Sequence, residues 1–128
     1  MKKIMLSIFG LSLTALLATG ASLPSGAAGR SVFDGLWSVE IITQRGDCDR
    51  SLRYALRIVD GRVHADDQRY QVEGAVAPGG AIRVIVAEAG RSASGVGHLT
   101  HDRGRGQWRT STNECAGEWI AARRVAEN

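Results

Sequence analysis

Hydrophobic and polar residues alternate with a period of two along most of the chain beyond its first thirty residues. The stretch 36–43 carries Trp37, Val39 and Ile41 on one face, and 52–59 repeats the alternation. Such a pattern is typical of β-strands that bury one face and expose the other to solvent. It predicts eight short strands, at 36–43, 52–59, 62–65, 69–76, 81–88, 92–100, 105–111 and 116–124.

Sequences typical of tight turns separate these strands. Asp60-Gly61 lies between the second and third strands, and Pro78-Gly79-Gly80 lies between the fourth and fifth. Asp-Gly favours a two-residue hairpin, because both turn positions require a left-handed backbone. Consecutive hairpins form a meander, and eight strands can close into a barrel without free edges. We therefore expect an all-β fold, a small eight-stranded antiparallel up-and-down barrel. An open twisted sheet and a sandwich are the alternatives.

The N-terminal segment has a different character. Lys2 and Lys3 precede an apolar run with small residues, and Ala18-Thr19-Gly20 offers a small-residue cleavage site. These features predict a secretory signal peptide, whose apolar run is shorter than the ~20 residues that span a bilayer. We expect a periplasmic or secreted protein without a membrane span after cleavage, an uncleaved anchor helix being the alternative. The expected organisation is signal peptide and cleavage region 1–28, linker 29–33 and barrel domain 34–125.

Charge argues against a nucleic-acid partner. Beyond the signal peptide the chain has no lysine, and its 14 arginines oppose 13 acidic residues, a formal charge of +1. These arginines are interspersed with acidic residues along the sequence and form no basic run. The sequence therefore predicts no patch that follows a phosphate backbone, and we expect a monomer without nucleic-acid binding.

The chain has two cysteines, Cys48 and Cys115, and an even pair in an exported protein indicates a disulfide. In an up-and-down meander, the loop after the first strand and the loop before the last strand lie at the same end. Barrel closure makes these two strands neighbours, so the two cysteine-bearing loops come together. Closure and the disulfide therefore support one another.

The first of these loops also carries charged residues around Cys48. Arg45-Gly46-Asp47 matches an adhesive tripeptide, but Gly-Asp is also ordinary turn chemistry. The acidic neighbours of Cys48 would raise the pKa of a free thiol, which argues against a nucleophilic cysteine. We interpret the segment as a loop joined by a disulfide, at an end of the barrel suited to contacting a partner. The candidate contact residues are Arg45, Asp47, Asp49 and Arg50.

Five aromatic residues could line either a core or a ligand site. Trp37, Trp108 and Trp119 fall on the first, seventh and eighth predicted strands, which adjoin across the closed seam. Alternation directs all three inward, where each would bury on the order of 200 Å² as part of the core. Tyr54 and Tyr70 have the same inward phase on the second and fourth predicted strands.

A ligand-binding interpretation of these aromatics requires an internal void. Inward glycines at Gly74, Gly95 and Gly97 could leave such a space beneath the aromatic side chains. An eight-stranded barrel has the size at which the interior is either filled or holds one small ligand. A filled core and a small-ligand cavity are therefore both open interpretations.

Groups that would support catalysis are few. No Gly-x-Ser-x-Gly segment is present to position a serine nucleophile. Glu40 and Glu118 fall on the first and last predicted strands, on the face opposite the tryptophans, so we expect both in solvent. His98 and His101 are three apart, and such residues face opposite sides of a strand. We therefore expect no enzyme activity, no metal site and no cofactor.

The segment FDGLWSV resembles the start of the lipocalin and avidin type of barrel. In those barrels a Gly-x-Trp opens the first strand, and a basic residue of the last strand packs over the tryptophan. Gly35 and Trp37 match the first element, and Arg123 or Arg124 could supply the second. The pattern FDGLWSV…GDCDRSLRY…GQW…CAGEW is also similar to small exported proteins of Gram-negative bacteria whose function is generally unassigned.

These observations lead to three functional hypotheses. The first is an exported β-barrel binding module for a small ligand or an envelope protein, with the compact, disulfide-linked form of many hydrolase inhibitors. The second is a structural or stress-related envelope protein that binds no discrete ligand. The third, an enzyme, would require a polar cluster that folding assembles from separated residues.

Overall fold

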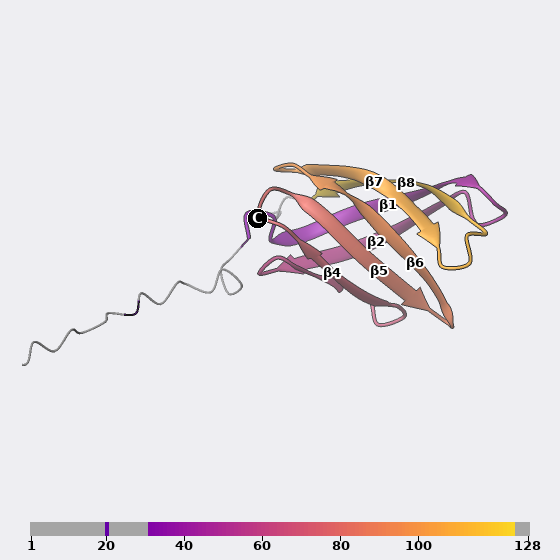
Figure 1. Cartoon of the computed structure of the whole chain (residues 1–128), viewed down its shortest axis with the longest axis horizontal. Helices are drawn as coiled ribbons and strands as arrows, with labels where there is room; N and C mark the ends of the chain where they lie inside the picture. Colours follow the sequence, from indigo (N-terminus) through magenta and orange to yellow (C-terminus); the bar gives the residue numbers. More distant parts are fainter. Residues whose placement is uncertain (1–19, 21–30, 125–128) are drawn as a thin grey trace, which may run out of the picture.

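The computed structural model describes residue 20 and residues 31–124. Consecutive strands in this part of the chain pair antiparallel, and β8 pairs with β1 to close a barrel (Figure 1). The predicted eight-stranded meander barrel is confirmed, and the open sheet and the sandwich are excluded. The strands are β1 (Gly35–Arg45), β2 (Ser51–Val59), β3 (Arg62–Ala65), β4 (Gln71–Val76), β5 (Ala81–Glu88), β6 (Arg91–Leu99), β7 (Arg103–Thr110) and β8 (Ala116–Arg123).

Strand ends differ from the predicted ones by a few residues at most. One difference bears on the site: β4 begins at Gln71, whereas the alternation places its start at residue 69. Asp67 accepts a hydrogen bond from the Arg69 backbone N–H at 2.9 Å. This local side-chain-to-backbone bond stabilises a turn, so the strand begins two residues later than the alternation predicts. Tyr70 consequently belongs to the turn between β3 and β4.

The seam between β1 and β8 carries the disulfide at one end. Paired residues run from Trp37↔Arg123 to Thr43↔Gly117, and a register shift follows before Arg45. The predicted Cys48–Cys115 disulfide lies just beyond this shift, with the two Cα atoms 6.2 Å apart. We call this the disulfide end of the barrel.

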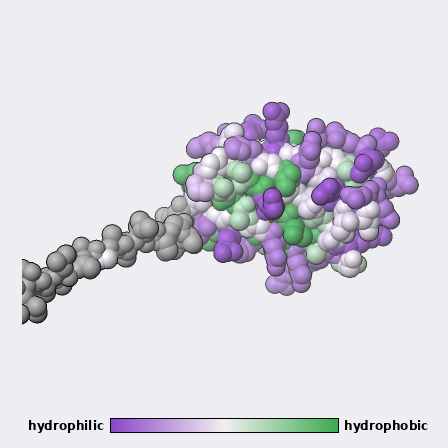
Figure 2. Space-filling model, in the orientation of Figure 1, coloured by the Kyte–Doolittle hydropathy of each residue, from purple (hydrophilic) through white to green (hydrophobic). Residues whose placement is uncertain are grey.

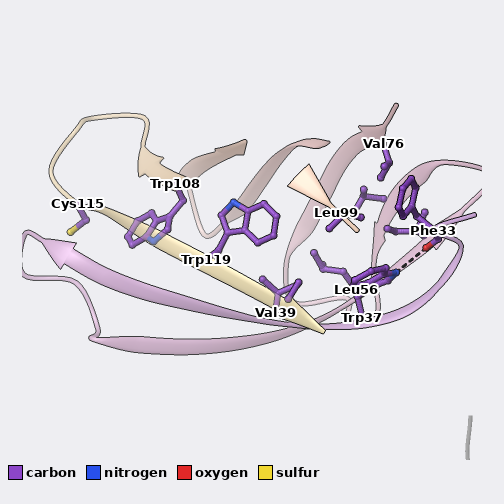
Figure 3. Packing of buried hydrophobic residues seen from close by; sticks show 12 residues of the cluster. Phe33, Trp37, Val39, Leu56, Val76, Leu99, Trp108, Cys115 and Trp119 are labelled. Carbon is purple, nitrogen blue, oxygen red and sulfur yellow. Dashed lines mark hydrogen bonds between the residues drawn. The ribbon is translucent and has the colours of Figure 1, made fainter. Parts of the chain in front are cut away.

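Apolar side chains fill the barrel interior. Figure 3 shows Trp108 and Trp119 on the side of Cys115, with Trp37 and Phe33 farther along the interior. The buried apolar residues, each less than 10% exposed, are Phe33, Trp37, Val39, Leu56, Ile58, Val63, Val76, Leu99, Trp108, Cys115, Trp119 and Ala121. The predicted inward faces of the strands are therefore the core.

Residues before β1 cover the end of the barrel opposite the disulfide. Phe33 is only 5% exposed, and its carbonyl accepts a hydrogen bond from the Trp37 indole N–H at 2.8 Å. Asp34 accepts backbone N–H groups from Asp60 and Gly61, which ties the β2–β3 turn to the same segment. Residues 31–33, expected to be linker, thus belong to the folded domain. The predicted signal peptide, its cleavage site and the last residues of the predicted barrel domain, 125 onward, lie outside the described residues.

Candidate functional site

The barrel wall is incompletely paired between β2 and β4. β3 has only four residues and pairs with the second half of β2, residues 56–59. Its other side pairs with β4 at a single position, Arg62↔Ala75. The first half of β2, residues 51–54, therefore has β1 as its strand neighbour on one side and no paired strand on the other.

In this half of β2, some backbone N–H and C=O groups have no strand partner among the described residues. The Asp66 N–H donates to the Ala55 carbonyl, so Ala55 directs its backbone groups away from β1. Backbone direction alternates along a strand, so Ser51 and Arg53 direct their N–H and C=O groups to the same side. β3 ends at Ala65 and does not reach them. In the described part of the chain, no strand pairs with these two residues on that side.

A groove of about 540 Å³ lies along this unpaired edge of β2. It extends from the inward-facing Tyr54 to the outward-facing Arg53, and Arg124 bounds it on the outer surface while donating to the Ser38 hydroxyl at 2.7 Å. A second hollow, more open, lies on the other side of the β3–β4 turn. The groove is lined by Ser38, Leu52, Arg53, Tyr54, Ala55, Asp66, Asp67, Arg69, Tyr70, Glu88 and Arg124.

Two tyrosines form the aromatic part of the groove. The ring centroids of Tyr54 and Tyr70 are 4.9 Å apart with an angle of 83° between planes, an edge-to-face contact. Partial burial raises the pKa of Tyr54, and the Glu88 carboxylate raises it further. Partial burial and Asp67 raise the pKa of Tyr70, against a smaller opposing effect of a hydrogen bond from the Ala55 backbone. Both phenols therefore stay neutral well beyond neutral pH.

Charged groups of both signs surround these rings. The Arg69 guanidinium donates to the Asp67 carboxylate through two nitrogens, at 2.9 and 2.7 Å, which lowers the pKa of Asp67. Arg53 and Glu88 are exposed, and neither takes part in an ion pair within the described residues. The groove therefore offers a cation, an anion, two phenols and free backbone groups to a bound molecule.

The predicted loop-end contacts lie outside the groove. Arg45, Asp47, Asp49 and Arg50 are exposed at the disulfide end, where the Arg45 guanidinium is 3.5 Å from the Asn113 carbonyl that accepts its hydrogen bond. Of the four, Asp49 lies near enough to add to the raised pKa of Tyr54, after burial, Glu88 and Tyr70. The loop-end contacts therefore stay a prediction, and the groove at the neighbouring edge of β2 is a separate candidate site.

Gly46 has a structural role within the Arg-Gly-Asp segment. Its φ of +96° lies in the left-handed region that glycine tolerates. A Cβ at this position would lie 2.7 Å from the Cys115 Sγ. The glycine therefore lets the β1–β2 loop approach the β7–β8 loop closely enough for the disulfide.

The three tryptophans are part of the core. Trp37, Trp108 and Trp119 are 2%, 8% and 7% exposed. Each indole N–H donates to a backbone carbonyl: that of Trp37 to Phe33, that of Trp108 to Ile42 and that of Trp119 to Val96, at 2.8, 3.0 and 3.1 Å. None of the three lines the groove.

The void proposed beneath the inward glycines is filled. The Trp119 indole lies against the inner faces of β6 and β7, where a Cβ at Gly97 or Gly106 would collide with it. A Cβ at Gly95 would lie 3.5 Å from the Trp119 Nε1, and one at Gly74 would lie 2.9 Å from a Val84 methyl group. Of the two open interpretations, the filled core therefore applies at these glycines, because neighbouring side chains occupy the space that the missing Cβ atoms leave.

Arg123 provides the contact that the lipocalin-type resemblance implies. Its guanidinium carbon lies 4.9 Å from the Trp37 ring centroid, a cation–π geometry. The same group donates to the carbonyls of Asp34 and Val32 at 2.6 and 2.7 Å. Of the two predicted candidates, Arg123 thus covers the tryptophan, whereas Arg124 points to the outer surface and bounds the groove.

The remaining candidates for chemistry do not converge on the groove. Glu40 and Glu118 stand on the outer face opposite Ile120 and Ile42, so they are diagonal and not directly paired. Glu40 accepts a hydrogen bond from the Ser51 hydroxyl at 3.1 Å. Among residues 31–124, no group of three histidine, cysteine, aspartate or glutamate side chains is arranged to hold a metal ion. No helix in that range is long and apolar enough to cross a membrane.

Sequence reasoning found two of the groove residues, Tyr54 and Tyr70, and missed the rest. The charged lining residues Arg53, Asp66, Asp67, Arg69, Glu88 and Arg124 come from four separate segments. One signal was available: the predicted third strand has four residues whereas the second has eight. That difference in length indicates that half of the second strand lacks a partner.

Comparison with known proteins adds no relative. No protein-family model matches the chain, and no curated protein matches it. The resemblances to lipocalin-type barrels and to small exported proteins of Gram-negative bacteria therefore stay predictions.

Proposed function

We propose that this protein is an exported binding module whose partner is another protein, bound as an extended segment along the unpaired edge of β2. The observation that carries the proposal is the pair of free backbone positions at Ser51 and Arg53, which lie beside a groove containing two aromatic rings. An extended peptide can add a strand to such an edge, with the backbone supplying affinity and side-chain pockets supplying specificity.

A protein partner accounts for the shape of the site better than a small ligand does. Sites for small molecules are mostly enclosed and apolar, and they bury most of their ligand. Here the interior is filled by tryptophans, and the groove is open and lined by groups of both charges. A peptide segment could use the free backbone groups, the Tyr54–Tyr70 pair and the unpaired charges of Arg53 and Glu88 together.

The exported and inhibitor-like parts of the proposal are supported by other features. The N-terminal signal-like segment and the Cys48–Cys115 disulfide are typical of proteins that fold in an oxidising compartment. A compact barrel with a disulfide beside its exposed edge holds that edge rigid, which lowers the entropy lost on binding. Hydrolase inhibitors commonly have this form.

The proposal is tested by removing one backbone donor from the edge. Proline at residue 53 lacks the N–H that faces the groove and leaves the β1–β2 hydrogen bonds in place, because Arg53 directs its backbone groups away from β1. Arg53→Gln is the matched control, since it loses the charge and keeps the N–H. A photo-crosslinking residue at position 54 identifies the partner in an envelope extract, and affinities are then measured with that purified protein.

We expect Arg53→Pro to abolish binding of the crosslinked protein and Arg53→Gln to weaken it only partly. Retention of the disulfide and of the far-ultraviolet spectrum shows that each variant is folded. Equal affinity of Arg53→Pro and the native chain would overturn the edge as the site. Absence of any crosslinked protein would favour the alternative of a structural envelope protein.

A further inference from the structure

Arginines that are far apart in the sequence gather on the outer face of β5, β6 and β7. The outward positions of these strands hold Arg83 on β5, His98 on β6 and Arg103, Arg105 and Arg109 on β7, all exposed. We call these five residues the arginine wall. The sequence alone does not indicate this surface, because its arginines are spread along the chain. Strand alternation places every second residue on one face, and so brings these separated arginines to the same side of the sheet.

The strand register brings the members of the wall close to one another. His98 is paired with Arg105 across β6 and β7, and Arg83 is paired with Val96 across β5 and β6. Adjacent strands lie roughly 4.8 Å apart, so long arginine side chains on three strands act together on one ligand. The outward positions of β5, β6 and β7 include no acidic residue, and the exposed Glu88 at the end of β5 has the inward phase and lines the groove. Glu73 on β4 and Glu118 on β8 border the face.

These arginines form no ion pair among the residues that the structure describes. Both ion pairs found among residues 31–124 involve Arg57 or Arg69, which lie on β2 and before β4. The four wall arginines therefore present a surface of one sign on a chain whose formal charge beyond the signal peptide is close to neutral. Such a surface attracts an extended anion and repels a second copy of itself.

Two apolar side chains stand exposed among these cations. Ile85 is 50% exposed and Val96 is 49% exposed, and they are diagonal neighbours because Ile85 pairs with Ser94, two residues before Val96. Figure 2 shows hydrophobic atoms in the middle of this view, over β5 and β6, surrounded by hydrophilic side chains. Exposed aliphatic residues flanked by arginines are suited to the boundary between lipid headgroups and acyl chains.

We propose that the arginine wall docks the protein on the surface of an anionic phospholipid membrane. The guanidinium groups would bind headgroup phosphates, and Ile85 and Val96 would enter the interfacial layer. A nucleic acid fits this face less well, since its outward positions carry no aromatic side chain on which bases could stack. The wall lies on strands other than those of the groove, so membrane docking does not depend on the proposed peptide site.

The first test measures binding of the native chain to vesicles by co-sedimentation. Vesicles of phosphatidylglycerol are compared with vesicles of phosphatidylcholine, which carry a phosphate but no net charge. We expect binding to the phosphatidylglycerol vesicles alone. Raising the ionic strength from about 0.05 M to about 0.5 M should release the protein, because screening shortens the reach of each charge.

The second test removes two positive charges from the wall and compares this variant with a control variant of the same net charge. Arg83→Gln with Arg105→Gln should weaken partitioning roughly 25-fold, since each arginine near an anionic surface contributes about fivefold. The control removes two exposed arginines at β2, Arg50→Gln with Arg57→Gln, and should change partitioning less than threefold, roughly, because β2 lies opposite β6 in the barrel. Ile85→Thr, which keeps a β-branched side chain, should weaken binding to phosphatidylglycerol vesicles at low ionic strength, where the native protein is bound.

Three results would overturn the proposal. The first is equal binding to both vesicle types, and the second is an equal loss from the wall and control variants. The third is salt-sensitive binding to a short DNA duplex that is at least as tight as binding to phosphatidylglycerol and is lost in the same wall variant. All variants change exposed side chains, and an unchanged thermal midpoint shows that any loss of binding is not a loss of folding.

Discussion

At the scale of single residues, the core depends on where glycines meet tryptophans. Trp119 projects from β8 across β7 toward β6, and the glycines on those strands give its indole the space that side chains would otherwise take. The buried indole N–H then reaches the Val96 carbonyl at 3.1 Å. The large aromatic side chain is thus buried with its N–H group satisfied. A buried donor without a partner would be costly in a protein interior.

Gly106→Ala should therefore destabilise the barrel through overpacking. A Cβ at Gly106 would collide with the Val96 backbone carbonyl and lie 2.6 Å from the Trp119 Nε1, and we expect a loss of about 1–3 kcal/mol in the free energy of unfolding. Gly79→Ala is the control, since no atom lies within 4 Å of its added Cβ, and it should change stability by less than about 0.5 kcal/mol. Urea unfolding followed by tryptophan fluorescence measures both. Equal effects of the two variants would show that Trp119 does not need the space at Gly106.

The groove tyrosines make a prediction about alkaline pH. Tyr54 and Tyr70 are the two tyrosines of the chain, and both have a pKa raised above the ordinary 10.0. The fold favours the neutral phenols, so their contribution to stability is present below about pH 10 and is lost as pH rises through the raised pKa values. Phenolate absorbance should titrate at a higher pH in the native protein than in denaturant. Glu88→Gln should lower the pKa of Tyr54 and so narrow this difference; coincident titrations would contradict the predicted burial.

At the scale of elements, two connections hold the barrel closed at its seam. The disulfide joins the loops at one end of β1 and β8. At the other end, the Arg123 guanidinium at the end of β8 donates to the carbonyls of Val32 and Asp34, which precede β1, and lies over the Trp37 ring of β1. The seam between the first and last strands is therefore held at both ends by contacts that add to its backbone ladder.

Replacing the disulfide tests the first connection. The two cysteines are 67 positions apart, and closing such a loop in the unfolded chain contributes about 4 kcal/mol in the chain-entropy treatment. Cys48→Ala with Cys115→Ala should lower the free energy of unfolding by up to that amount. Amide hydrogen exchange should rise most near Thr43 and Arg45, where the ladder shifts register. Stability that is the same with and without the disulfide would refute this role.

Arg123→Ala tests the second connection, with Arg124→Ala as its matched control. Arg123→Ala removes three hydrogen bonds to carbonyls, including the one to His101 at 3.0 Å, together with the contact to Trp37. We expect a loss of about 2–4 kcal/mol. Arg124 makes one hydrogen bond to Ser38 on the surface, and its removal should cost less than about 0.5 kcal/mol. Thermal unfolding compares the two, and a larger effect of Arg124→Ala would contradict the assignment of the covering arginine.

At the scale of the whole molecule, the barrel separates three tasks. Its interior is filled and supplies stability, the unpaired edge of β2 supplies a groove, and the outer face of β5–β7 supplies positive charge. A protein that is docked on a membrane through one face and binds a segment of a partner through another would suit an envelope location. That combined role joins our two proposals, and each has its own test.

The export prediction is also tested on the whole chain. Residues 1–128 expressed in a Gram-negative host should appear in the periplasmic fraction as a shortened, disulfide-bonded protein whose N-terminus lies within 21–29. A chain without residues 2–28 should remain in the cytoplasm with both cysteines reduced, since that compartment keeps thiols reduced. Intact mass before and after thiol labelling measures both properties. Recovery of the uncleaved chain in the membrane fraction would favour the anchor helix instead.

The sequence by itself determined the strand number, the meander order, the inward tryptophans and the disulfide. These features depend on periodicity and turn chemistry, which act between neighbouring residues, and on topology, which follows from counting strands. The pairing of Cys48 with Cys115 could be predicted because hairpin order alone places their loops at one end.

Only the tertiary structure decided whether the barrel is hollow and where its functional surfaces lie. Trp119 fills the space over Gly97 and Gly106 because three strands converge there, and no local pattern encodes how far a side chain reaches. Likewise, Arg83 and Arg105 meet on one face through pairing with β6, although 22 positions separate them. The groove arises because β3 ends before it covers β2, so it depends on relative strand lengths and register, which are properties of the closed barrel as a whole.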